Sequence, residues 1–139
     1  MKVSVYLGEP VEEALDAVGE AALRSRSGRI NTVVDRYLRI IQDAMPAFTK
    51  NEWFAIFDAH NGVVMSNWLS ALHACNNVAD SPWLDARWGI DHANLARRME
   101  ALPTAGRIAV AEAIERFWGA AYEMETDALK KIGVRLRNP

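Results

Sequence analysis

The residues best placed for chemistry are polar side chains that alternate along the first segment, Lys2–Leu7. Lys2, Ser4 and Tyr6 share one face, and apolar residues occupy the other. A strict period of two is typical of a half-buried strand. Their ammonium and hydroxyl groups can take part in hydrogen bonds, so Lys2, Ser4 and Tyr6 are the first candidates for a binding face.

Nearly all of the remaining sequence has helical periodicity, so this strand has no partner within its own chain. A lone strand leaves its backbone N–H and C=O groups without ladder bonds. A second copy of the chain supplies the simplest partner. The resulting two-stranded antiparallel ribbon fits the major groove of DNA, which predicts a homodimer that binds double-stranded DNA.

The strand is followed by two predicted helices and a basic turn. Pro10 suits the first position of a helix. The turn contains Arg24, Arg26, Ser27, Gly28 and Arg29, with Ser27 as the expected N-cap of the second helix. That helix should end before Pro46. Free N–H groups and the positive end of the helix dipole favour a phosphate at such a helix start.

Strand, helix, short basic turn and helix within about 45 residues resemble the ribbon-helix-helix family of DNA-binding proteins. The resemblance rests on Lys2–Leu7, the helix that starts at Pro10, and the segment 27–31. It implies an intertwined dimer in which Lys2, Ser4 and Tyr6 read bases. It also implies phosphate contacts from Arg24, Arg26, Ser27, Gly28 and Arg29.

Charge is unevenly distributed in this region. Residues 1–45 contain six Lys and Arg against seven acidic residues, whereas DNA-binding domains are usually basic. Five of the acids fall between residues 9 and 20, while residues 24–39 contain five arginines and one aspartate. Phosphate contacts depend on the local field, so the basic turn keeps the DNA-binding prediction open.

Composition limits the other function classes. The chain has 139 residues, a net charge of −2 and one cysteine, Cys75. No intrachain disulfide can form, and no signal peptide or long apolar run is present, so we expect a cytoplasmic protein without a membrane segment. His60, His73 and His92 are scattered, and no metal-ligand or phosphate-loop spacing occurs. We expect no enzyme activity, no metal and no cofactor.

The predicted fold is mainly α, with a ribbon-helix-helix module at residues 1–45 and an all-α domain at residues 46–139. Thr49 and Glu52 form a capping-box pattern that opens the first helix of this domain. Further helices are expected at about 64–79, at 91–101 with Asp91 as cap, and from 104 to about 129. The basic tail, residues 130–137, extends the helix, docks as a strand or stays loose.

All five tryptophans follow residue 50, which mainly indicates a helical core. Trp83 and Trp88 flank a loop-like segment and are candidates for a protein-binding patch, since tryptophan is enriched at binding hot spots.

Three functions remain open on the sequence. The first is a dimeric transcriptional repressor or autoregulator. The second is an antitoxin of a toxin–antitoxin pair whose residues 46–139 bind the toxin. The third is a mobile-element inhibitor or adaptor that binds a protein partner and uses the ribbon only for dimerisation.

Overall fold

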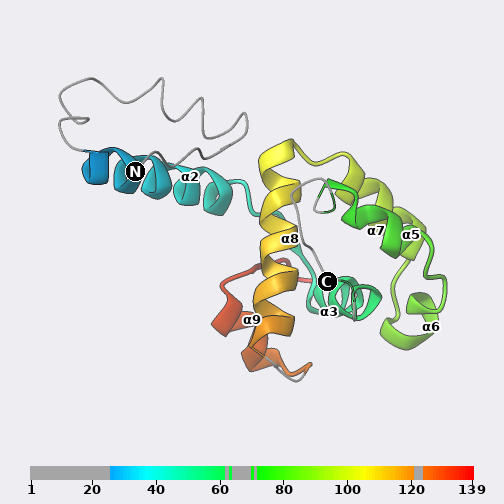
Figure 1. Ribbon diagram of the computed structural model, residues 1–139. Coiled ribbons are helices and arrows are strands. Elements are labelled where there is room, and N and C mark those ends of the chain that lie inside the picture. Colours follow the sequence, from blue (N-terminus) through cyan, green and yellow to red (C-terminus); the bar gives the residue numbers. More distant parts are fainter. Residues whose placement is uncertain (1–25, 62, 64–69, 71, 121–123) are drawn as a thin grey trace. The chain divides into compact units, whose positions relative to one another are not determined.

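The computed structural model describes residues 26–61, 63, 70, 72–120 and 124–139 (Figure 1). The described part is mainly helical and contains one small two-stranded sheet, which confirms the predicted predominance of helix. The chain divides into two compact units, Met1–Asp43 and Ala44–Pro139. The predicted strand Lys2–Leu7 and the helix expected after it lie outside the described residues, so the ribbon-helix-helix module stays a prediction.

Helix α2, Arg26–Asp43, belongs to the first unit. It ends three residues before Pro46, in agreement with the restriction that a proline places on the residue before it. Its start differs from the prediction. Arg26 is already helical, so Ser27 lies inside the helix and is not its N-cap.

Helix α3, Lys50–Ala59, opens the second unit with the predicted capping box. The Thr49 hydroxyl accepts the Glu52 N–H, and the Glu52 carboxylate accepts the Thr49 N–H. Every residue from Glu52 to Asp58 is buried. The helix is therefore a central element of its unit, and its C-cap is His60.

Between residues 73 and 101, where every residue is described, the chain forms the short helices α5 (Ala74–Ala79), α6 (Leu84–Trp88) and α7 (His92–Glu100). The Asp91 carboxylate accepts the Asn94 N–H at 3.0 Å and confirms the predicted cap of α7. Residues 64–69 and 71 of the helix predicted at 64–79 lie outside the described residues. Helices α5 and α7 lie side by side (Figure 1).

The prediction of a single long helix from residue 104 to about residue 129 is wrong. The structure has α8 (Thr104–Gly119) and a separate α9 (Thr126–Ile132). Gly119 is a poor helix former, and Glu125 adopts an extended backbone before α9 begins. Helix α9 ends at Gly133, whose φ of 78° requires the left-handed conformation that glycine adopts most readily.

Two of the alternatives left open for the basic tail, residues 130–137, occur together: residues 130–132 belong to α9, and Arg135–Leu136 docks as a strand. Strand β2, Arg135–Leu136, pairs in parallel with β1, Ala47–Phe48, and the Arg137 N–H donates to the Phe48 carbonyl at 2.9 Å. The prediction that this domain is all-α is therefore wrong in one detail, because the domain contains a small two-stranded sheet. Two-residue strands are too short to show a period in the sequence.

Aromatic rings form the centre of the second unit. Phe57 of α3 stacks on Phe117 of α8 at 4.4 Å between ring centroids, and Trp53 lies 5.9 Å from Phe57. Trp53, Phe57 and Phe117 have no exposed surface. No helix within the described ranges is long and apolar enough to span a membrane.

Candidate functional site

The residues predicted to contact DNA fall into two groups. Lys2, Ser4, Tyr6 and Arg24 lie outside the described residues. Arg26, Ser27, Gly28 and Arg29 form the first turn of α2. Four of the five predicted phosphate contacts are thus consecutive residues of one helix in the described part of the chain.

An apolar stripe runs along α2 beyond this turn. Ile30, Val34 and Leu38 are 54%, 46% and 50% exposed, respectively. Their spacing of four residues places them on one face of the helix. Single exposed apolar residues are ordinary, but a row of three on one helix is typical of a surface that another element or molecule covers.

The two tryptophans of the predicted protein-binding patch have different environments. Trp83 is 45% exposed. Trp88 packs against Phe54 with ring centroids 5.4 Å apart, and its Nε1–H donates to Asp58 at 2.9 Å. The indole of Trp88 thus has an internal role, and Trp83 presents the larger exposed surface.

A buried carboxylate with two arginine partners was not predicted. Glu52 is 5% exposed. Its Oε1 accepts a hydrogen bond from the Arg137 guanidinium at 3.2 Å, and its Oε2 accepts one from the Arg98 guanidinium. Arg98 also lies over the Phe48 ring, 5.7 Å from its centroid. Burial, and then the charge of Arg137, lower the pKa of Arg98. The sequence signals only the capping role of Glu52, because its partners lie 46 and 85 residues away.

A groove of about 630 Å³ borders this cluster. It is lined by the start of α3, the loop before α7 and the tail: residues 49–52, 89–91 and 136–139. Lys50 and Arg137 are opposed there by Glu52 and Asp91. The two positive and the two negative side chains of the lining cancel in net charge, so these side chains give the groove no strong preference for an anion or a cation.

Asp85, Asp91 and His92 could offer metal-ligand atoms, which lie within 4.8 Å of one another. These atoms are already engaged. Asp85 accepts both the backbone N–H and the Nδ1 of His92 at 2.8 Å, and the backbone bond lowers the pKa of Asp85. Asp91 caps α7. The geometry is accounted for by hydrogen bonds that hold the loop before α7.

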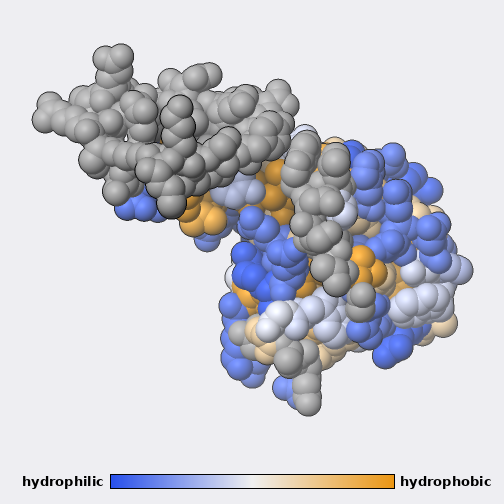
Figure 2. Space-filling model, in the orientation of Figure 1, coloured by the Kyte–Doolittle hydropathy of each residue, from blue (hydrophilic) through white to orange (hydrophobic). Residues whose placement is uncertain are grey.

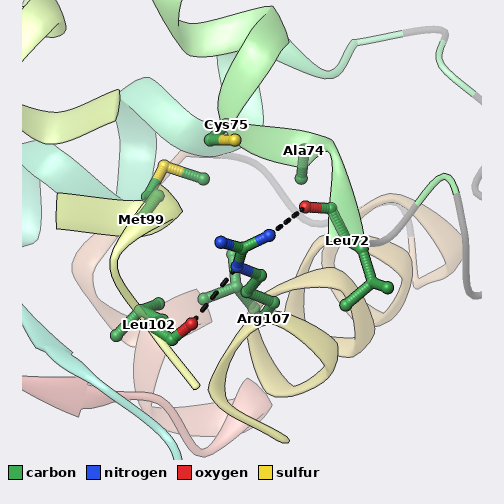
Figure 3. A pocket seen from close by; sticks show the side chains of 7 residues that line it. Leu72, Ala74, Cys75, Met99, Leu102 and Arg107 are labelled. Atoms are coloured by element: carbon green, nitrogen blue, oxygen red, sulfur yellow. Dashed lines mark hydrogen bonds between the residues drawn. The ribbon is translucent and has the colours of Figure 1, made fainter. Parts of the chain in front are cut away.

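A further pocket, around Arg107, has a volume of only about 10 Å³ (Figure 3). Arg107 donates to the Leu102 carbonyl at 3.2 Å and to the Leu72 carbonyl at 3.3 Å, with Cys75 and Met99 across the cavity (Figure 3). Such a volume holds about one water molecule at most. Arg107 links the segment before α5 to the loop before α8 through these two hydrogen bonds. The pocket around it is too small for a substrate.

The face of the second unit seen in Figure 2 is mostly hydrophilic over α5 and α7. The strongest feature for binding in the described part is therefore α2, with its arginine-containing first turn and its exposed apolar stripe. No known protein family, curated protein or solved structure matches the chain.

Proposed function

We propose that the protein is a dimeric, sequence-specific DNA-binding transcriptional regulator, acting as a repressor or autoregulator through residues 1–45. The observation that carries this proposal is the combination of features on α2. Its first described turn contains Arg26 and Arg29, and Ile30, Val34 and Leu38 expose apolar surface that a second chain would cover.

In the proposed complex, the strands of two chains form a ribbon in the major groove. Lys2, Ser4 and Tyr6 would contact base edges and supply sequence preference. Arg24, Arg26 and Arg29 would contact backbone phosphates and supply affinity without sequence information. The local excess of arginine between residues 24 and 39 supports this division of roles.

A second candidate, a protein-binding inhibitor or adaptor, is favoured by one observation. Trp83 is exposed on the second unit beside Arg87, whose side chain is 62% exposed. Tryptophan and arginine are the residue types most enriched at protein-binding hot spots. The antitoxin alternative receives less support, since toxin-binding segments of that kind are often disordered alone, and residues 44–139 have a buried aromatic core.

The test is a titration of the full chain with labelled duplexes at several salt concentrations. The duplexes are fragments from upstream of the protein's own reading frame and random controls of equal length. We expect Lys2→Ala and Tyr6→Ala to lower affinity for the preferred duplex by about 1–3 kcal/mol each and to relax preference. Arg29→Ala should weaken binding to all duplexes alike and reduce the salt slope by about one.

Arg116→Ala is the matched control, because Arg116 is an exposed arginine in the second unit; it should change neither affinity nor preference. Absence of binding at low salt, where phosphate contacts are strongest, would overturn the regulator. The ribbon would then be a dimerisation device, and Trp83 the first residue to test for a protein partner.

A further inference from the structure

His60 is a buried histidine whose two ring nitrogens both face backbone carbonyl oxygens. It lies at the C-terminal end of α3 and has no exposed surface. Its Nδ1 is 2.6 Å from the carbonyl oxygen of Ile56, in the last turn of α3. Its Nε2 is 3.0 Å from the carbonyl oxygen of Ala74, the first residue of α5. One side chain thus contacts the ends of two helices.

The number of protons on the ring decides what these contacts are. A carbonyl oxygen only accepts hydrogen bonds, and a neutral imidazole has a single N–H. A neutral His60 therefore satisfies one carbonyl and points a nitrogen lone pair at the other. Only the doubly protonated ring donates to both.

The backbone indicates which nitrogen holds the proton in the neutral ring. The His60 N–H, the usual helical donor to the Ile56 carbonyl, bonds to the Phe57 carbonyl at 3.1 Å instead. The Ile56 carbonyl then depends on the His60 side chain, and the Nδ1 contact is the shorter of the two. Nδ1 is accordingly the donor, and Nε2 is the nitrogen that lacks a proton opposite Ala74.

Burial and the two carbonyls act on the ring in opposite directions. Burial lowers the pKa of His60 below its ordinary value of 6.5, and the two carbonyls raise it by less. The charged groups of the neighbouring helices are engaged elsewhere. Asp58 of α3 pairs with Arg87 and Trp88.

On the other two helices that contact α3, Cys75 is the titratable residue of α5. On α8, the half-buried Glu112 interacts with Arg116 and Glu115. None of these groups is among the causes that shift the pKa of His60. The protonation of the ring is therefore decided by burial and by the positions of the Ile56 and Ala74 carbonyls.

We propose that His60 is a proton-dependent clamp between α3 and α5. In the neutral state it bonds only the end of its own helix. A proton at Nε2 converts the repulsive contact with the Ala74 carbonyl into a second hydrogen bond and fastens the start of α5 to the end of α3. Acidification thus changes the number of hydrogen bonds between His60 and these two helices, while the contacting residues stay the same.

The test is NMR of the histidine rings in the full chain, with nitrogen-15 labelling, between pH 8 and pH 5. At pH 8, His60 should hold its proton on Nδ1. As the pH falls, Nε2 should gain a proton that exchanges with water at least about tenfold more slowly than the ring protons of the exposed His73, because opening is required for exchange at a buried site. A neutral ring protonated at Nε2, or a fast-exchanging Nε2 proton, would overturn the clamp.

A pair of variants gives an independent measurement. Because the pKa of His60 is lowered on folding, the cost of burying the charged ring exceeds the gain from its second hydrogen bond. The free energy of unfolding should therefore be highest above pH 6.5 and should decrease as the pH falls from 6.5 towards the folded-state pKa, even though the local contact between α3 and α5 gains a bond. His60→Gln should abolish this part of the pH dependence of unfolding, whereas His73→Gln, an exposed neighbour of α5, should retain it. Equal pH profiles for the two variants would refute the proposal. If His60→Gln does not fold, the ring spectra of the unaltered chain decide.

Discussion

Replacement of Glu52 by alanine should strongly destabilise residues 44–139, because one buried carboxylate serves three partners. The Thr49 N–H donates to Glu52 Oε1 at 3.0 Å, and loss of a cap contact of this kind costs about 1–1.5 kcal/mol. The Arg98 and Arg137 side chains are 33% and 54% exposed. Solvent screens both pairs, so each contributes only about 0.5–1 kcal/mol. The sum is a loss of about 2–3.5 kcal/mol.

Urea unfolding followed by tryptophan fluorescence measures this loss directly. All five tryptophans lie after residue 50, so the signal reports on the second unit alone. In a thermal scan the same loss corresponds to a decrease in Tm of at least about 8 °C for a unit of this size.

Glu52→Gln separates the cap from the charge. It keeps an acceptor for the Thr49 N–H but removes the charge that faces Arg98 and Arg137, and it should cost about 1–2 kcal/mol. Glu100→Gln, at the exposed end of α7, is the matched control and should change stability by less than about 0.5 kcal/mol. A loss below about 1 kcal/mol for Glu52→Ala would refute the assignment of Glu52 as the link between α3, α7 and the tail.

Three further changes test separate contacts in the same unfolding assay. Trp88→Phe removes the donor at 2.9 Å from the buried carboxylate of Asp58 and should cost about 1–2 kcal/mol; no loss would contradict a structural role for the indole. Gly133→Ala should cost about 1 kcal/mol or more, because φ is 78° there, whereas Gly119→Ala, with open space around its Cβ position, should be neutral or stabilising. Equal changes in stability for Gly133→Ala and Gly119→Ala would refute the argument that the positive φ at Gly133 requires glycine. Burial raises the pKa of Glu112, so Glu112→Gln should be more stable than the unaltered chain at pH 7 and lose that advantage below pH 4.5; a gain that persists at pH 4 would count against this.

Local signals in the sequence were sufficient for several elements. The Thr49–Glu52 capping box and the Asp91 cap each depend on residues three positions apart, and both occur in the structure as predicted. The break of the last helix was missed, because its apolar spacing continues from α8 towards α9 and periodicity does not register a single weak helix position such as Gly119.

The arrangement around Glu52 could not be predicted for a different reason. Its partners come from α7 and from the strand β2, and the strand itself exists only because two residues of the tail pair with two residues before α3. Contacts across such separations leave no local pattern. Glu52, Arg98 and Arg137 look like ordinary surface charges in the sequence, and only the 5% exposure of Glu52 shows that they are not.

The contrast between the two units bears on the proposed function. Residues 44–139 bury their aromatic core within one chain, with Trp53, Phe57 and Phe117 fully enclosed. Helix α2 instead leaves a row of three large apolar side chains about half exposed. By the hydrophobic effect, the gain from association is largest where apolar surface is still in water. The exposed row on α2 therefore supports placing the proposed dimerisation in the first unit.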